Sequence, residues 1–355
     1  MKKIQKVLLI GTIPPPIGGD AIWMLNYMSF LKENDINFSF VDTSLVGKRA
    51  HNVSNNYSFF AELKRTISIR NNIKKQLKHN IYDAVHMNIN CSPLGTIRDY
   101  YNARRIIKRN SNLILHCHCN IEDQIGKRKI SLKYLKKLLM LSKTVIVLNE
   151  SSFNFVSKIC TKSTAITLIP NFINDDEIAK NKKIINSEIK NILFVGHIKK
   201  EKGIDEYLET SAFFPDYKFL ICGKLSDKYD ELTLCKYKNV QYLGELEHKK
   251  VISLIDDSDL FIFPTYTEGF SLALLEAMSR GIPIIATDVG ANKEMLGKND
   301  KCGIIIPPKN SQSIIGAINA MKEEKVRKTY SKKTIDRVKK LYSKSVVCNK
   351  ILELY

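Results

Sequence analysis

Short apolar runs alternate with longer amphipathic stretches through the first half of the chain. The first run is Val7-Leu8-Leu9-Ile10, and a segment rich in Gly and Pro follows it at 11–19. Further runs lie at 38–41, 84–86, 113–116 and 144–148, with helical patterns between them at 21–34, 59–79, 100–109 and 131–141. Apolar strands that alternate with helices are typical of a parallel sheet covered on both faces.

The same alternation begins again after a polar stretch at 174–190 that is rich in Lys and Asn. Apolar runs predict strands at 191–195, 218–222, 260–263 and 283–286, and helices at 204–214, 248–255 and 271–280. A chain of 355 residues is long enough for two domains. We therefore expect an α/β protein with two Rossmann-like, doubly wound domains facing a central cleft.

The domain limits follow from these patterns. We expect a first domain over 1–170, a second over 171–335, and a C-terminal helix over 336–355 that could pack back on the first domain. Sheets of this kind bind ligands outside the carboxyl ends of their strands. The loops that follow the strands are therefore the places to search for chemistry.

The densest candidate chemistry follows the strand at 260–263. Glu268 lies in the loop, Gly269 allows a ligand to approach the backbone, and Ser271 opens a helix that contains Glu276. A helix start is an anion site, because its first N–H groups are unpaired and its dipole is positive there. Two carboxylates beside such a start suit the hydroxyls of a nucleotide sugar. An acidic first turn on a surface helix is the alternative.

A second feature follows the strand at 191–195. Gly196 ends that strand, and His197 opens a basic loop in which Lys202 could reach a phosphate. From spacing alone, a solvated cluster of lysines is the simpler explanation of the same residues.

Two histidines and two cysteines end the strand that begins at Leu113. The period of a strand sends His116 and His118 to one face and Cys117 and Cys119 to the other. This separation opposes a single four-ligand metal site. His118 lies further out than His116, which we expect in the core or behind the site.

The charge distribution is uneven. The chain has 56 Lys and Arg against 36 Asp and Glu, a net charge of +20, and the region 61–143 holds 18 basic and 5 acidic residues. A basic surface of this size favours an anionic partner, while a generally high lysine content is the alternative. Within it, 131–143 is a basic amphipathic helix that could lie on an anionic membrane or simply cover the sheet. Basic and aromatic residues do not interleave as nucleic-acid binding would require.

The motif from Glu268 to Glu276, with seven residues between the glutamates, resembles the signature of a large glycosyltransferase family. The family includes bacterial mannosyltransferases and sucrose-phosphate synthase, and is also called glycosyltransferase family 4 or glycosyl transferases group 1. The segments "ILFVGHIKKEKGID", "FLICGK", "VQYLGEL", "GIPIIATDVGANKEML" and "CGIIIPPKN" are similar to its second domain in the same order, and "PPPIGGDA" is similar to its Gly-Gly loop. The resemblance implies the GT-B fold, with the donor held by the second domain and the acceptor by the first.

The resemblance also implies roles for single residues. Lys202 matches a family lysine that contacts the donor diphosphate. Glu268 matches a glutamate that contacts donor-sugar hydroxyls, and Glu276 matches a glutamate that binds the ribose. The family also places one histidine at such a strand end, where it reaches the donor sugar, and His118 is the residue that we assign to this position. The resemblance therefore implies catalytic roles for His118, Glu268 and Lys202. The implied donor site comprises Gly18, Gly19, Gly196, His197, Lys202, Gly269, Phe270, Ser271, Leu272 and Glu276. Two positions depart from the family: His197 replaces an arginine, and Ser271 replaces a smaller residue.

The implied activity is a retaining transfer of a sugar, with a UDP-sugar as the expected donor. The expected acceptor is a glycan or a polyprenyl-diphosphate-linked glycan, in the synthesis of a bacterial surface polysaccharide. We expect no cofactor, no metal and no nucleic-acid partner. A UDP-sugar epimerase of the same architecture and a basic nucleic-acid-binding protein are the alternatives. No apolar run is long enough for a membrane span or an export signal, so we expect a cytoplasmic protein that could also bind the inner face of the cell membrane.

Overall fold

The structure is a computed structural model. It describes residues 4–15, 18–45, 59–89, 91–110, 112–125, 128–160, 164–181, 183–226, 229–234 and 236–355. Contacts within the chain separate two compact units, one formed by 1–171 with 344–355 and the other by 172–343. The segment 336–355 is shared between them: α13 (Glu324–Leu341) belongs to the second unit and α14 (Lys344–Leu352) to the first.

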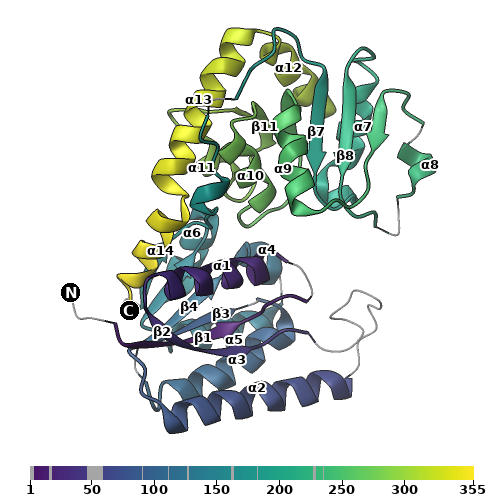
Figure 1. The fold of residues 1–355 in the computed structure, drawn as a ribbon. Helices are drawn as coiled ribbons and strands as arrows, with labels where there is room; N and C mark the ends of the chain where they lie inside the picture. Colours follow the sequence, from purple (N-terminus) through teal and green to yellow (C-terminus); the bar gives the residue numbers. More distant parts are fainter. Residues whose placement is uncertain are drawn as a thin grey trace. The chain divides into compact units, whose positions relative to one another are not determined.

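The first unit is built on a parallel sheet of six strands in the order β2-β1-β3-β4-β5-β6 (Figure 1). The strands are β1 (Lys6–Gly11), β2 (Asn37–Asp42), β3 (Ala84–Ile89), β4 (Leu113–Cys117), β5 (Thr144–Val147) and β6 (Ala165–Leu168). The helices, besides α14, are α1 (Gly19–Glu33), α2 (Phe59–His79), α3 (Pro93–Ile106), α4 (Ile121–Ile125), α5 (Lys129–Leu139) and α6 (Glu150–Ile159).

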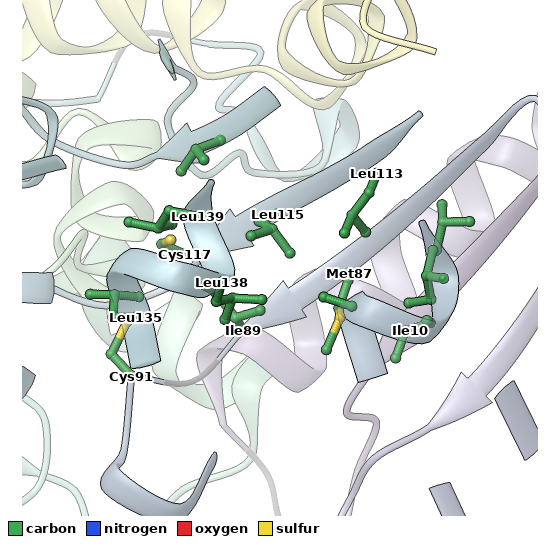
Figure 2. Packing of buried hydrophobic residues seen from close by; sticks show 14 of the residues in the cluster. Ile10, Met87, Ile89, Cys91, Leu113, Leu115, Cys117, Leu135, Leu138 and Leu139 are labelled. Carbon is green, nitrogen blue, oxygen red and sulfur yellow. The ribbon is translucent and has the colours of Figure 1, made fainter. Parts of the chain in front are cut away.

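The two faces of this sheet are covered by different helices. Alternate strand residues such as Ile10, Met87 and Leu115 pack against α2, α3 and α5 in one buried cluster (Figure 2). The residues between them point to the opposite face, where the aromatic side chains of α1 lie against His86 and His116. This alternation makes both faces apolar enough to bury, and it places the two histidines on the α1 side.

The second unit repeats the architecture, with a parallel sheet in the order β12-β11-β10-β7-β8-β9. The strands are β7 (Asn191–Val195), β8 (Lys218–Cys222), β9 (Val240–Tyr242), β10 (Leu260–Phe263), β11 (Ile284–Thr287) and β12 (Ile304–Ile306). The helices, besides α13, are α7 (Ile204–Ser211), α8 (Glu231–Leu234), α9 (His248–Asp257), α10 (Leu272–Arg280), α11 (Asn292–Leu296) and α12 (Ser311–Met321), with short 3₁₀ turns η2 (Asp175–Glu177) and η3 (Lys200–Lys202). The predicted fold class, two doubly wound α/β domains, is confirmed.

The strand orders locate the ligand-binding edge of each sheet. In the second sheet the chain runs outward from β7 in one direction and from β10 in the other, so the order reverses between these two strands. In the first sheet the reversal lies between β1 and β3. Open parallel sheets bind ligands at such switch points, outside the carboxyl ends of the strands. None of the described helices has the length and apolarity needed to cross a bilayer.

Candidate functional site

The loops after β7 and β10 begin on either side of the switch point in the second sheet. The loop after β7 leads through η3, and the loop after β10 leads into α10. Side chains and backbone groups of the two loops hydrogen-bond to each other. Lys202 and Glu268, predicted separately from sequence, come from these two loops.

Lys202 and Glu268 form an ion pair in the structure. The ammonium of Lys202 contacts a carboxylate oxygen of Glu268 and also lies 5.7 Å from the ring centroid of Phe263. The side chains are 20% and 14% exposed, so the pair is mostly shielded from water. Because the two charges neutralise each other here, an anion that binds to Lys202 has to compete with Glu268.

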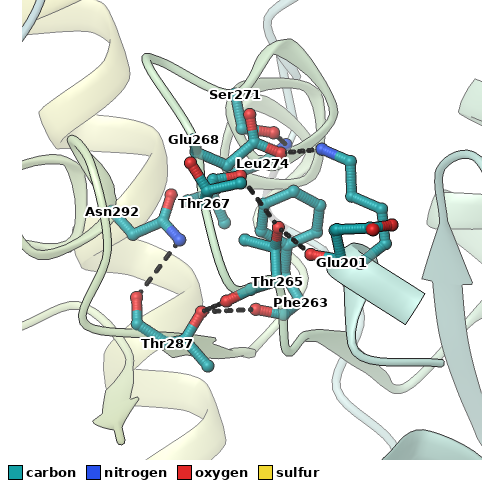
Figure 3. Close-up of polar contacts among 10 residues, drawn as sticks. Glu201, Phe263, Thr265, Thr267, Glu268, Ser271, Leu274, Thr287 and Asn292 are labelled. Atoms are coloured by element: carbon teal, nitrogen blue, oxygen red, sulfur yellow. Dashed lines mark hydrogen bonds and ion pairs between the residues drawn. The ribbon is translucent and has the colours of Figure 1, made fainter. Parts of the chain in front are cut away.

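Three buried polar side chains hold these loops in place (Figure 3). The hydroxyl of Thr265 lies 3.2 Å from the carbonyl oxygen of Glu201 and 3.1 Å from that of Thr267. The hydroxyl of Thr287 donates to the Thr265 carbonyl at 2.6 Å, and Asn292 donates to the Thr287 carbonyl at 3.1 Å. The loops after β7, β10 and β11 are therefore connected, although the sequence did not indicate these residues as part of the site.

The start of α10 has the features of an anion site. Ser271 caps the helix, and its side chain accepts a hydrogen bond from the Leu274 N–H at 3.2 Å. Phe270 is buried, with its ring 5.7 Å from that of Tyr342. Only the backbone of Phe270 is thus available to a ligand, together with Gly269 and the first helical residue, Leu272. Ser271 therefore supplies a side-chain cap and leaves the backbone of the first turn in place.

Glu276 has a partner that was not predicted. Its carboxylate lies 3.1 Å from Nε2 of His248, the first residue of α9. Hydrogen bonding to Glu276 raises the pKa of His248 above its usual value. The pair holds the carboxylate on the exposed side of α10, where a hydroxylated ligand could replace or share the histidine.

The His248–Glu276 pair should stabilise the second unit in a pH-dependent way. Because the pKa of His248 is raised in the folded state, its contribution is full below the unfolded-state pKa of about 6.5 and is lost as pH rises through the folded-state pKa. We expect His248→Gln to cost less than about 1 kcal/mol at pH 5.5, since the pair is partly exposed. Urea unfolding at pH 5.5 and pH 8.5 would show the difference from the parent shrinking, and a difference independent of pH would contradict this role.

Gly196 and His197 lie where the sequence placed them, directly after β7. The Gly196 N–H donates to the carbonyl of Cys222 in β8 at 3.0 Å. The loop that follows β7 therefore begins while its backbone is still paired with β8. The pKa of His197 is lowered, first by desolvation and then by the neighbouring cations Lys199 and Lys202. His197 is therefore neutral at pH 7 in the ligand-free protein.

Gly18 and Gly19 lie at the switch point of the first sheet. Gly18 precedes α1 with no side-chain cap, and Gly19 is the first helical residue. In the first turn, Asp20 accepts a hydrogen bond from the hydroxyl of Thr12 at 3.0 Å. A hollow of about 910 Å³ opens here, and its lining includes Gly18, Asn88 and His118.

His118 belongs to a cluster of neutral histidines on the α1 side of the sheet. Its ring centroid is 4.0 Å from that of His116, and both rings lie 4.7 Å from Trp23. Burial lowers the pKa of His86 and His118 to about 3, and burial with two neighbouring histidines lowers that of His116. His118 can thus donate or accept a hydrogen bond at pH 7, but it carries no charge.

Several buried polar atoms of this cluster have no hydrogen-bond partner in the described part of the chain. They are both ring nitrogens of His118, Nε2 of His116, and the side-chain amide atoms of Asn88. Buried polar atoms are rarely left unpaired, so these atoms indicate bound water or a ligand. The predicted alternation also holds, because Cys117 and Cys119 pack with the opposite core. The described residues contain no group of three His, Cys, Asp or Glu that could hold a metal.

A hydrogen-bond chain ending at the last residue fixes the orientation of His86. Tyr27 donates to the hydroxyl of Tyr355 at 2.7 Å, and this hydroxyl lies 2.7 Å from Nδ1 of His86. Nε2 of His86 in turn lies 3.2 Å from Nδ1 of His116. If each group donates once, His116 carries its proton on Nε2, the atom without a partner. The sequence did not suggest that Tyr355 lies behind the site.

Replacing Tyr355 with phenylalanine should destabilise the first unit. The change leaves Tyr27 and His86 without a common partner in a buried place, and each unpaired group costs about 1–3 kcal/mol. Urea unfolding followed by tryptophan fluorescence would report it, because Trp23 packs on the same histidines. Tyr101→Phe, on an exposed side chain, is the control. Equal stability of the two variants would show that the chain of hydrogen bonds contributes little.

Comparison with known proteins gives a family for the second unit. The family described as "Glycosyl transferases group 1" matches residues 175–340, nearly the whole unit. An uncharacterized 41.2 kDa protein from the cps region of Klebsiella pneumoniae is 25% identical over 63% of this chain and 65% of its own. That alignment therefore spans slightly less than two thirds of the relative.

Other relatives align over most of both chains. The UDP-Gal:alpha-D-GlcNAc-diphosphoundecaprenol alpha-1,3-galactosyltransferase of Escherichia coli is 25% identical over 89% of this chain and 88% of its own. The capsular polysaccharide biosynthesis glycosyltransferase CapM of Staphylococcus aureus is 23% identical over 99% of this chain and 97% of its own.

Solved structures match the fold over its whole length. Sucrose-phosphate synthase from Thermosynechococcus elongatus superposes with a TM-score of 0.80 at 17% identity, covering 99% of this chain and 98% of its own. Anabaena HepE in complex with UDP and glucose has a TM-score of 0.73 at 14% identity, covering 98% of each chain. Both the sequence match and the two-unit architecture agree with the predicted resemblance. Residues 175–340 thus match the group 1 glycosyl transferase family, and the chain as a whole has the two-domain GT-B fold of these structures.

Proposed function

We propose that this protein transfers a sugar from a UDP-sugar to a glycan or polyprenyl-diphosphate-linked acceptor, with retention of the anomeric configuration and without a metal. One observation carries the proposal: Lys202 and Glu268 meet beside the capped start of α10, at the switch point of the second sheet. A cation, a carboxylate and a helix start in one place suit the diphosphate and the sugar of such a donor. The names of the relatives support the acceptor class.

In this proposal the second unit binds the donor. The diphosphate lies between Lys202 and the first N–H groups of α10, both of which stabilise negative charge. Glu268, released from Lys202, accepts hydrogen bonds from the sugar hydroxyls, and Glu276 accepts them from the ribose. His197, neutral in the free protein, gains a proton more easily once a diphosphate lies beside it.

The reaction is a displacement on one face of the sugar. The acceptor oxygen forms a bond to the anomeric carbon on the same side from which the nucleoside diphosphate leaves. The acceptor proton passes to the departing diphosphate, so no protein nucleophile is needed. Catalysis depends on stabilising the charge that develops on the leaving group, which is the role of Lys202 and the start of α10.

The hollow of the first unit takes the acceptor in this proposal. Its polar end is formed by Asn88 and His118, whose unpaired atoms can hydrogen-bond to sugar hydroxyls. His118 acts as a neutral group that orients a hydroxyl, because its lowered pKa prevents it from acting as a cationic acid at pH 7.

Two measurements test the function. Thermal-shift assays with UDP-, GDP-, ADP- and TDP-sugars should show the largest stabilisation with one UDP-sugar. Incubation of that donor with lipid-linked glycan acceptors should give a new α-linked product by NMR, and the rate should survive EDTA. An inverted linkage would refute retention, and loss of activity that a divalent metal restores would refute the metal-free mechanism. Isomerisation of the donor without any acceptor would identify an epimerase instead.

A further inference from the structure

A basic groove lies between α2 and α3, on the outer side of the first unit. The hollow has a volume of about 580 Å³. Its lining consists of Arg70, Lys74, Leu77, Lys78, Tyr101, Arg104, Arg105, Lys108 and Arg109. Seven of these nine residues are cationic and none is acidic, so the groove concentrates positive charge around a space large enough for several phosphate groups.

The seven cations form no ion pairs among the described residues, although the guanidinium of Arg104 lies 5.9 Å from the ring centroid of Tyr100. In the described part of the chain, no carboxylate oxygen lies within ion-pairing distance of any of them. By contrast, other arginines of the same helices are paired: Arg65 with Glu62 at 2.9 Å, and Arg98 with Asp99 at 2.8 Å. Like charges gathered without counter-charges weaken a folded protein by self-repulsion. Their concentration here therefore points to an external anion.

Exposed apolar residues lie on α2, the helix that carries three of these seven cations. Phe60, Leu63 and Ile67 are 81%, 46% and 50% exposed, although large apolar side chains on a helix are usually buried. At 3.6 residues per turn they share the outward side of α2 with Lys74 and Lys78. The inward side carries buried Ile69, Ile73 and Leu77. The outward side of α2 is therefore apolar in its first half and cationic in its second half.

We propose that this outer surface of α2 and α3 docks on an anionic membrane. Lipid phosphates occupy the groove, while Phe60, Leu63 and Ile67 enter the interfacial region. Unpaired cations next to exposed apolar side chains form the pattern of a helix that lies in the membrane interface. This inference rests on the geometry of the first unit alone and goes beyond the proposed reaction.

The groove lies next to the hollow that takes the acceptor in the proposed function. Arg70 and Tyr101 line both the groove and the larger hollow that contains Asn88 and His118. A surface held on a membrane here has the larger hollow directly beside it. A lipid-linked acceptor in that membrane would therefore lie next to the larger hollow.

The lysines of α5, indicated by the sequence, differ from those in the groove. Lys137 lies 6.0 Å and 5.8 Å from the ring centroids of Tyr100 and Tyr134, and it lines neither the groove nor the larger hollow. Lys133 and Lys136 are exposed but line no described hollow. We therefore assign the headgroup contact to α2 and α3, with α5 as a weaker addition.

Vesicle sedimentation tests the inference with the full chain. The parent should bind phosphatidylglycerol-containing vesicles strongly at low salt and less at physiological salt, and should bind pure phosphatidylcholine weakly. In Arg70→Gln/Lys74→Gln/Arg105→Gln/Arg109→Gln, we expect the partition coefficient for anionic vesicles to fall by about 100-fold or more. Circular dichroism checks that this variant is folded, and thermal shifts with the donor check that the second unit is unaffected.

A matched variant controls for net charge. Lys325→Gln/Lys332→Gln/Lys339→Gln/Lys340→Gln removes the same charge from exposed lysines of α13, and it should bind vesicles within about threefold of the parent. If both quadruple variants lose binding equally, the effect is one of net charge and the groove is not the site. Phe60→Ser/Ile67→Ser should reduce the binding that persists at high salt, and unchanged binding would refute the apolar contact.

Two soluble anions distinguish a membrane from other phosphate sources. Inorganic phosphate and a duplex DNA fragment are added at the same phosphate concentration as the vesicles. At physiological salt, neither anion should lower the partition coefficient for anionic vesicles by more than about twofold. If the protein bound DNA as tightly as anionic vesicles, the groove would be a nucleic-acid site. If inorganic phosphate alone displaced the protein from the vesicles in a saturable way, the groove would be a site for small anions. Either result overturns the proposal.

Discussion

Gly290→Ala is expected to reduce sugar transfer by about 100-fold or more, although the residue carries no functional group. Gly290 follows β11 with φ of 53°, a conformation that L-residues rarely adopt. A Cβ at this position would overlap the carbonyl oxygen of Glu268 and lie 3.1 Å from that of Gly269. The loop that presents Glu268 would have to move, and displacements of about 1 Å at a catalytic group can cost this much in rate.

The control for this prediction is another glycine of the same unit. Gly316 lies within α12, where an added Cβ has no neighbour within 4 Å. Gly316→Ala should leave the rate unchanged and stabilise the protein by about 0.5–1 kcal/mol, because alanine favours a helix. The measurement is kcat/KM for the donor in both variants. Parental kcat/KM in Gly290→Ala would show that the loop tolerates the displacement.

The sequence predicted the central strands of both sheets, and among the edge strands it predicted β2 at 38–41 but missed β6 and β9. Central strands such as β4 and β10 are buried along their whole length, so each appears as an apolar run. The edge strands β6 and β9 are partly exposed, and neither was predicted as a strand. Their positions depend on hydrogen bonds to β5 and β8. Such pairing leaves little trace in a short sequence.

Helix limits show the same dependence on tertiary structure. The helix predicted at 100–109 begins seven residues earlier as α3, where Pro93 occupies the first turn. Proline is tolerated there because the first N–H groups of a helix are unpaired. The helix predicted at 336–355 is in fact the end of α13 followed by α14, divided at Tyr342 and Ser343.

The candidate site was predictable as a set of residues but not as a set of contacts. The spacing of the motif indicated Glu268 and Glu276, and the segment after the strand at 191–195 indicated Lys202. Their partners depend on which loops meet in space, and nothing in the sequence pairs Lys202 with Glu268 or His248 with Glu276. Tyr355 is an extreme case, because it contacts a histidine 269 residues away.

The Lys202–Glu268 pair gives the second large prediction, in which two substitutions have different effects. Lys202→Ala should weaken the binding of free UDP by about 1.5–3 kcal/mol, or roughly 10- to 150-fold, because a charge-assisted hydrogen bond to the diphosphate is lost. Glu268→Gln should abolish transfer, with a loss of about 100- to 1,000-fold in kcat, because the charged acceptor for the donor sugar is gone. Because the pair is mostly shielded from water, each substitution leaves the other charge without its partner, and circular dichroism checks that both variants are folded.

The effect of Glu268→Gln on UDP binding separates a catalytic role from a structural one. In the ligand-free protein Glu268 competes with the diphosphate for Lys202, so its neutralisation should leave UDP affinity unchanged or increase it. Isothermal titration of free UDP into the parent, both single variants and the double variant measures this directly. In the double variant UDP affinity should equal that of Lys202→Ala, because no cation remains to be released. If Glu268→Gln weakens UDP binding as much as Lys202→Ala does, the pair acts as one structural unit, and the separate roles assigned to the two side chains are wrong.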